Sequence, residues 1–320
     1  MSPNAPEFEF NSLLDLIDEP NGVIEPLSSG ASCDVWRILG HRNDYALRVF
    51  TKRHGRCPLP IEIAVRDGLA KRGAAVATPI ATSLDHPTIN PATAWSLDTF
   101  VAGTFCARGA LPARAAQDLG RTLAILHAIP TKGFGRLLAM EPDSAIGTER
   151  AAHDAVHCRF DKPLPNTEHD WKGHPLMQHE PGLRAKMQPL INQVIDAQSA
   201  SKAAICHGDL HEQQLICSGE KLAALIDFAD ATVLDRRWDF ASLYYFHGRD
   251  VLHNALIGYS RNEAERKTLA NDAKLFSIGI AVHHAARSRL PGKEHRLAAA
   301  LKHIAQVLKT ASPSASRLTR

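Results

Sequence analysis

The most informative stretch of the sequence is Ile205-Cys-His-Gly-Asp-Leu-His-Glu-Gln-Gln-Leu-Ile216, together with Leu225-Ile-Asp-Phe-Ala-Asp230 a short distance further on. Each opens with an apolar, strand-like fragment and then delivers a carboxylate, Asp209 or Asp227, where the chain is expected to turn out of its sheet. Phosphoryl transfer needs one group to orient an attacking hydroxyl and others to hold Mg²⁺ on phosphate oxygens. Two carboxylates presented in this way suit that chemistry.

Composition bounds the class of protein. The 320 residues with 44% apolar content are ample for a large core, in one bilobal unit or in two domains. With 37 basic and 34 acidic residues the formal charge is +3, too balanced to predict binding to nucleic acid or a membrane. No apolar run reaches the roughly 18 residues of a membrane span, and no signal-peptide core follows the polar start. Six scattered cysteines without a CxxC pair predict a reducing, cytoplasmic location.

The first third of the chain is dominated by strand-like segments around one main helix. A short helix is expected near residues 13–17, and the main one over residues 61–72. Strands are expected over residues 23–27, 33–39, 45–50, 79–84 and 93–100. From Pro112 the pattern becomes helical, which indicates a boundary near residue 102.

We therefore predict an α+β chain with a strand-rich N-lobe over residues 1–101 and a mostly helical C-lobe over residues 102–320. The polar segment from about 133 to 201 resembles an insertion that carries specificity, with helix candidates over 146–159 and 182–197. Further helical patterns begin at Trp238 and continue over residues 256–260, 263–290 and 294–308.

Two features of the N-lobe bear on phosphate binding. In the turn Ser28-Ser-Gly-Ala-Ser32, the backbone N–H groups of Ser29, Gly30 and Ala31 could approach a phosphate because nothing bulky stands in front of them. Taken alone, such a turn is more often only a hairpin.

Arg48 lies in a strand that should have one face in the core. An inward-pointing Arg48 must be paired, because an isolated buried charge is very costly, and Glu62 near the start of the main helix is the natural partner. In the alternative interpretation Arg48 points outward and Glu62 merely favours a helix N-terminus.

A rival interpretation of the central motif is a metal-dependent hydrolase. In an extended backbone His207, Asp209 and His211 share one face, which is a plausible set of metal ligands. Against this interpretation, Asp227 has no neighbouring histidine, and the hairpin, Arg48 and Glu62 are left without a role. A phosphotransferase uses all of them.

Together these residues resemble the aminoglycoside phosphotransferase and choline kinase family, small-molecule kinases with a protein-kinase-like fold. His207-Gly-Asp-Leu-His211 is similar to the catalytic loop of that family, and Ile226-Asp-Phe228 is similar to its metal-binding strand end. The combination is much more specific than either piece. Weaker resemblances cover residues 27–32, 46–48 and 119–127, so the match spans most of the chain.

The resemblance implies a bilobal fold that uses ATP and Mg²⁺. It implies that Asp209 is the catalytic base and that Asp227 binds the metal. It also implies that Arg48, tethered by Glu62, contacts ATP phosphates.

The same resemblance places the hinge that meets adenine at Phe100 and Val101. His207 and His211 resemble positions that hold the loop by hydrogen bonds, and Asp239 resembles a support for that loop. None of these three is expected to be catalytic.

Two positions depart from the family pattern. Five residues after Asp209, where the family usually has Asn as a second metal ligand, this chain has Gln214, which offers the same oxygen at one methylene more reach. At the phosphate-contacting position it has Arg48 where protein kinases use Lys, and arginine binds phosphate bidentately. The hypothesis is a kinase that transfers the γ-phosphoryl group to a small-molecule hydroxyl, and the alternative is a weak or inactive nucleotide-binding pseudokinase.

The acceptor is expected to be a neutral, singly charged or weakly cationic hydroxylated molecule. A site for polycationic aminoglycosides should be strongly acidic. The segment 133–200 instead mixes nine acidic with seven basic residues. The C-terminal helices add five basic residues against one nearby acid, Glu294: Arg287, Arg289, Lys293, Arg296 and Lys302.

Overall fold

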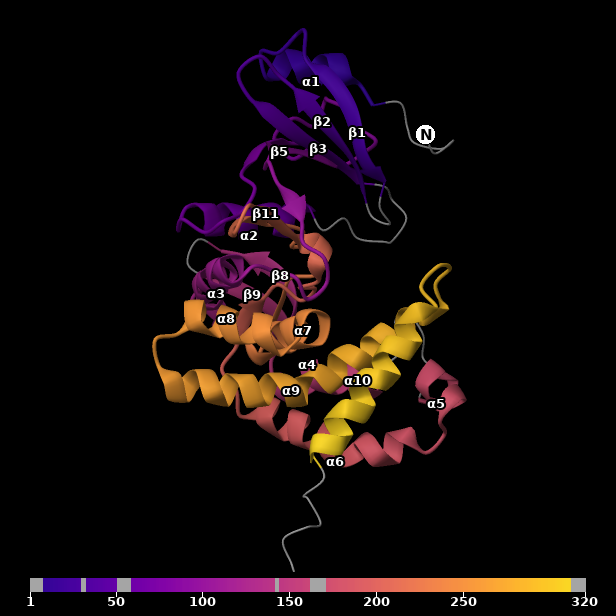
Figure 1. Cartoon of the computed structure of the whole chain (residues 1–320). Helices are drawn as coiled ribbons and strands as arrows, with labels where there is room; N and C mark the ends of the chain where they lie inside the picture. Colours follow the sequence, from indigo (N-terminus) through magenta and orange to yellow (C-terminus); the bar gives the residue numbers. More distant parts are fainter. Residues whose placement is uncertain (1–7, 30–32, 51–58, 142–143, 162–170, 312–320) are drawn as a thin grey trace, which may run out of the picture. The chain divides into compact units, whose positions relative to one another are not determined.

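The computed structural model describes residues 8–29, 33–50, 59–141, 144–161 and 171–311 (Figure 1). The chain divides into two compact units. The first unit comprises Met1–Cys106 and Gln213–Asp230, and the second comprises Ala107–Glu212 and Ala231–Arg320. The predicted nucleotide-binding half, residues 1–101, lies wholly within the first unit.

The first unit contains a five-stranded antiparallel sheet in the order β1-β2-β3-β5-β4. Its elements are α1 (Phe10–Leu16), β1 (Val23–Ser29), β2 (Cys33–Leu39), β3 (Asp44–Phe50), α2 (Leu59–Ala70), β4 (Pro79–Thr82) and β5 (Trp95–Thr99). Alternation along β3 buries Tyr45, Leu47 and Val49, which pack with Trp95 of β5 and Leu13 of α1 in one apolar cluster. The predicted strands and both helices of this part are confirmed.

The segment Gln213–Asp230 belongs to the first unit because its strands pair there. β11 (Leu215–Ser218) pairs with β12 (Lys221–Leu225) on one side and with the two-residue β6 (Thr104–Phe105) on the other. Leu225 also donates its N–H to the carbonyl of Ala75, at 2.8 Å. These pairings carry Asp227, two residues after β12, into the unit that holds Arg48.

The second unit combines long helices with a five-stranded sheet in the order β10-β13-β8-β9-β7. The strands are β7 (Thr131–Lys132), β8 (Phe134–Met140), β9 (Ala145–Glu149), β10 (Ala204–Cys206) and β13 (Thr232–Leu234). The helices are α3 (Ala113–His127), α4 (Ala152–Asp161), α5 (Pro175–His179), α6 (Leu183–Ser199), α7 (Arg237–His247), α8 (Arg249–Tyr259), α9 (Glu263–Ala286) and α10 (His295–Ala311). A short 3-10 turn, η4 (Arg287–Arg289), follows α9.

One prediction within this unit is wrong. The helix expected over 146–159 begins only at Ala152, because residues 146–149 form most of β9, which pairs antiparallel with β8 and parallel with β7. Strand partners from both sides override the local helical pattern.

The core of the second unit lies among α4, α6, α7, α9 and α10. Trp238 of α7 and Phe276 of α9 meet edge-on with ring centroids 5.1 Å apart. Figure 1 shows α9 and α10 as neighbouring orange and yellow helices joined by a short connection that includes η4. Within the described ranges, every helix is too short or too polar to cross a bilayer.

Candidate active site

The Arg48–Glu62 pair forms as predicted. Arg48 of β3 is only 14% exposed, and the Glu62 carboxylate on α2 is fully buried. Arg48 Nη1 donates to Glu62 Oε1, and Nη2 lies 3.3 Å from Oε2, so the pair is bidentate. Burial opposes the charge of Arg48, but the attraction of Glu62 outweighs it and raises the arginine pKa well above its ordinary value. Arg48 is therefore a fixed cation.

Glu62 is shared with a second arginine. Arg66, one helical turn further along α2, places Nε 3.7 Å from Glu62 Oε1 and Nη1 2.9 Å from Asp98 Oδ2 on β5. Burial raises the pKa of Asp98, and the charges of Arg66 and Arg48 oppose that effect. Arg66 and Asp98 were not predicted from the sequence, although the i, i+4 spacing of Glu62 and Arg66 is a usable signal.

Asp227 lies at the edge of this network. Its side chain is 40% exposed, and its Oδ1 lies 3.9 Å from Arg48 Nη2. Gln214 Nε2 donates to Asp227 Oδ2 at 3.2 Å, and the carbonyl of Gln214 accepts from Ile226 N–H. Asp227 has φ +64°, a left-handed backbone that is uncommon for a residue other than glycine. Strain of this kind persists where the surrounding structure fixes it, and it clusters at functional sites.

The structure brings four predicted residues together in the first unit: Arg48, Glu62, Gln214 and Asp227. The side chains of these residues fit the Mg²⁺ ion and the phosphate that they are expected to bind. Asp227 and Gln214 offer carboxylate and amide oxygens, the ligands that Mg²⁺ prefers. Rotating the terminal amide of Gln214 by half a turn would present its oxygen beside Asp227. Arg48 offers a guanidinium of the kind that binds phosphate bidentately.

The remaining predicted nucleotide contacts lie in the same unit. Ser29 ends β1, whereas Gly30 and Ala31 lie outside the described residues. Phe100 and Val101 follow β5, and Phe100 donates its N–H to the carbonyl of Asp44 at 3.1 Å. Their contacts with a nucleotide stay predictions.

Asp209 belongs to the second unit, three residues after β10. Gly208 before it has φ +87°, a conformation that glycine adopts without strain. His211 Nε2 lies 3.4 Å from Asp209 Oδ2, and His207 Nδ1 accepts from the Asp209 N–H at 3.3 Å. Burial raises the pKa of Asp209, but the hydrogen bond and charge of His211 outweigh it, so the pKa is lowered. Asp209 is ionised at neutral pH.

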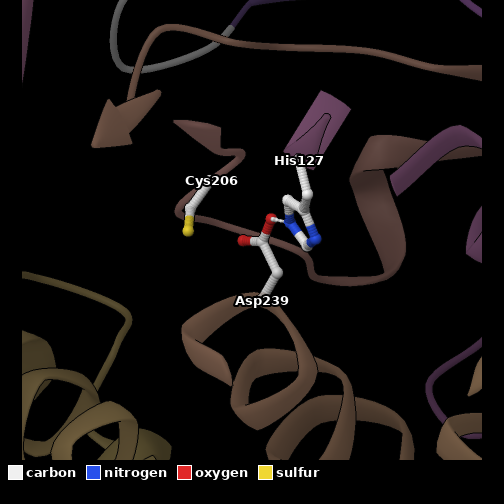
Figure 2. Close-up of side chains that lie close together, drawn as sticks. All are labelled: His127, Cys206 and Asp239. Carbon is white, nitrogen blue, oxygen red and sulfur yellow. Dashed lines mark hydrogen bonds and ion pairs between the residues drawn. The ribbon is translucent and has the colours of Figure 1, made fainter. Parts of the chain in front are cut away.

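A buried carboxylate holds the loop before Asp209. Asp239 of α7 accepts the N–H of His207 at 2.9 Å and that of Gly208 at 3.1 Å. His127, at the end of α3, places Nε2 3.1 Å from Asp239 Oδ2 (Figure 2). Burial raises the pKa of Asp239, but His127 outweighs it and keeps the carboxyl ionised. Asp239 is thereby confirmed as a support for the loop.

The metal-hydrolase interpretation gains no support from these contacts. Among the described residues, three side chains with possible metal-ligating atoms gather only at His127, Cys206 and Asp239, where those atoms lie within 4.8 Å of one another. Asp239 there is engaged with two backbone N–H groups and His127, and Cys206 Sγ lies 3.3 Å from the carbonyl of Asp235. Hydrogen bonding accounts for the cluster without a metal.

A sequence profile of the phosphotransferase enzyme family (APH) matches residues 23–270, which is most of the chain. The chain belongs to this family. The resemblance inferred from the two carboxylate motifs is thereby confirmed. A comparison with curated proteins found no significant match.

Solved structures of aminoglycoside phosphotransferases share the fold. APH(4)-Ia matches with a TM-score of 0.68 at 12% identity, over 95% of this chain and 98% of its own. The GDP and kanamycin complex of APH(2")-IIia matches with a TM-score of 0.62 at 11% identity, over 94% and 99%. The streptomycin–ATP complex of APH(2")-IIa gives 0.55 at 14% identity, over 95% and 97%. The predicted kinase-like α+β fold is confirmed.

Proposed function

We propose that this family member is an ATP-dependent phosphotransferase that moves the γ-phosphoryl group to a hydroxyl of a small molecule. The observation that carries the proposal is the cluster of Arg48, Gln214 and Asp227 in the first unit. It combines a permanent cation for phosphate with two oxygen donors for Mg²⁺. Solved structures of related phosphotransferases contain ADP, GDP or ATP, which supports the choice of a nucleotide as the ligand.

Each unit supplies a different part of the proposed reaction. In the first, Arg48, kept in place by Glu62, binds phosphate oxygens, and Asp227 with Gln214 holds the magnesium ion, which supplies charge neutralisation when bound. In the second unit, the ionised carboxylate of Asp209 accepts a hydrogen bond from the hydroxyl of the small molecule. This hydrogen bond orients the hydroxyl oxygen for attack. Asp239 keeps the backbone of this loop fixed.

ADP release tests the proposal directly. The full chain is incubated with Mg·ATP and a panel of hydroxylated metabolites and antibiotics. At least one acceptor should stimulate ADP release with saturable kinetics and give a phosphorylated product of the expected mass. Tight binding of Mg·ATP without ADP release from any acceptor would favour the pseudokinase. That alternative is supported by the orientation of the Gln214 amide, whose nitrogen and not its oxygen faces Asp227.

A further inference from the structure

Two cysteines of the first unit hold their sulfur atoms close together. Cys106 directly follows β6, and Cys217 is the third residue of β11. Their Sγ atoms lie 2.8 Å apart, and both are free thiols. A disulfide bond joins two sulfurs at about 2.05 Å, so the atoms need to approach by less than about 1 Å to form one.

Strand pairing brings these two cysteines together. β6 pairs antiparallel with β11, and Thr104 is directly opposite Cys217. Side chains two positions apart share a face, so Cys106 lies on the same side as Thr104 and diagonal to Cys217. Gly103 allows the close approach, because a Cβ there would lie 2.4 Å from the carbonyl oxygen of Cys217. The backbone that leads to Cys106 is therefore packed directly against β11.

A metal site does not explain the pair of thiols. A structural zinc site takes four ligands as a rule. Within the described part of the chain, the one group of three or more ligating side chains is that of His127, Cys206 and Asp239. Two thiols in contact without further ligands either pack as small apolar groups or close a disulfide.

A disulfide would join the two chain segments that make up the first unit. One segment, Met1–Cys106, carries Arg48, and the other, Gln213–Asp230, carries Asp227. In the reduced chain these segments are held together by non-covalent contacts, among them the pairing of β6 with β11. The two cysteines are 111 positions apart in the sequence. A covalent link across so long a loop strongly restricts the unfolded chain.

The two thiols differ in access and acidity. Cys106 is partly exposed, whereas Cys217 is only 4% exposed. Burial, and then the neighbouring Cys106 thiol, raise the pKa of Cys217 to about 12, so this thiol stays protonated at neutral pH. An oxidant in solution therefore reaches Cys106 first, and Cys217 is the thiol that reacts with the oxidised sulfur.

We infer that Cys106 and Cys217 are a site of reversible oxidative modification, at which hydrogen peroxide closes a disulfide that links the two segments of the first unit. The Cys106 sulfur first attacks one peroxide oxygen. An S–O bond forms, the O–O bond breaks, and the other oxygen leaves as water with the thiol proton. This inference does not depend on the proposed phosphotransferase function.

The second step forms the bond between the two sulfurs. The Cys217 sulfur attacks the sulfenic acid of Cys106, the S–S bond forms, and the S–O bond breaks. The hydroxide that leaves takes the proton of Cys217 and becomes water. In sum, two thiols lose two hydrogens, and one hydrogen peroxide is reduced to two water molecules.

Mass spectrometry of the full chain tests the modification. The reduced protein is treated with hydrogen peroxide, its remaining thiols are blocked with iodoacetamide, and it is digested with trypsin and Glu-C without a reductant. Cleavage after Glu212 separates Cys206 from Cys217. A peptide pair that links Cys106 to Cys217, two hydrogens lighter than the separate thiols, should be the main disulfide. Dithiothreitol should restore both thiols.

Substitutions assign the bond to this pair. Cys106→Ser and Cys217→Ala should each abolish the linked peptide. Cys33→Ser removes another partly exposed thiol of the same unit and should retain it. Oxidation of the two sulfurs to sulfinic acid without a linked peptide, or a link from either one to a different cysteine, overturns the inference.

Thermal melting and hydrogen exchange measure what the link does to the first unit. Oxidised wild type should melt at least about 5 °C higher than reduced wild type, because the link closes a long loop. The amides of residues 213–230 should exchange more slowly in the oxidised protein. Both gains should disappear with dithiothreitol and in Cys106→Ser treated in the same way. Equal melting and exchange of the oxidised and reduced wild type would overturn the linking of the two segments.

Discussion

Asp209 and Asp227 both follow short strands and are exposed to a similar degree, 35% and 40%, yet the two units hold them differently. Asp227 faces a guanidinium and a side-chain amide, groups that a charged ligand can rearrange. Asp209 follows backbone fixed by a fully buried carboxylate, Asp239. The contacts of Asp227 are made by side chains that a charged ligand could replace, whereas the backbone before Asp209 is held by hydrogen bonds within the protein.

The largest expected effect is that acidification lowers the free energy of unfolding of the second unit more than that of the first. Burial lowers the pKa of His174, His247 and His303 to about 4 and that of His284 to about 3, and all four belong to the second unit. Once unfolded they titrate near 6.5, so between these values the unfolded state binds more protons. The stability that they contribute is complete above about pH 6.5 and is lost as the pH falls towards 4.

With four protons taken up on unfolding, the free energy of unfolding should fall by about 5 kcal/mol per pH unit in the middle of this range. Denaturant titrations at pH 7, 6, 5 and 4 measure the slope, with fluorescence and hydrogen exchange to locate the unfolding. In His247→Leu, which removes a ring without hydrogen-bond partners, the slope should drop by about one proton. A slope below one proton, or first unfolding of the first unit, would contradict the expected contrast.

The next effect tests whether the second unit depends on a buried carboxylate. Asp239→Ala removes the partner of two backbone N–H groups and of His127. The free energy of unfolding should fall by about 3 kcal/mol, measured by urea denaturation. Asp272→Ala, which breaks the partly exposed pair with Arg237, should cost at most about 1 kcal/mol. Equal losses in the two variants would remove the special role of Asp239.

A slightly smaller change is expected in the activation free energy of the reaction when Asp209 loses its charge. Asp209→Asn keeps the shape of the side chain but removes the charge that accepts the acceptor proton. Turnover with a saturating acceptor should fall by about 10² or more, which corresponds to about 2.7 kcal/mol. The exposed Asp250→Asn in α8 serves as the control and should retain full turnover. Near-wild-type turnover of Asp209→Asn would show that another group orients the hydroxyl.

The smallest effect concerns Gln214. If its amide oxygen binds Mg²⁺, Gln214→Ala should raise the Mg²⁺ concentration for half-maximal activity several-fold, whereas Gln214→Asn should keep much of the wild-type response. A magnesium titration of ADP release measures both. An unchanged response in the alanine variant would limit Gln214 to its contacts with Asp227 and Ile226.

Much of the fold and the Arg48–Glu62 pair could be predicted because their signals are local. Strand-like fragments that end in Asp209 and Asp227 are visible in the sequence, and a buried arginine such as Arg48 demands a nearby acid. The residues that escaped prediction depend on distant partners. β6 has two residues and exists only beside β11, and β9 is fixed by β7 and β8.

Residues that lie behind Arg48 and the Asp209 loop were not predicted for the same reason. Asp98 is buried with Arg66, which comes from another element. The proximity of the Cys206 sulfur to His127 and Asp239 likewise joins three separate segments of the chain. Neither relation has a spacing in the sequence that would reveal it.

We propose that Asp227 serves nucleotide binding and that Asp209 serves turnover. Calorimetry of Mg·ATP with the full chain tests it most directly, comparing wild type with Asp209→Asn and Asp227→Asn. Asp209→Asn should bind Mg·ATP within a few-fold of wild type. Asp227→Asn should bind it at least about ten-fold more weakly and lose the difference between ATP with and without Mg²⁺. Equal weakening in both variants, or unchanged binding in Asp227→Asn, would contradict the division of labour between the two units.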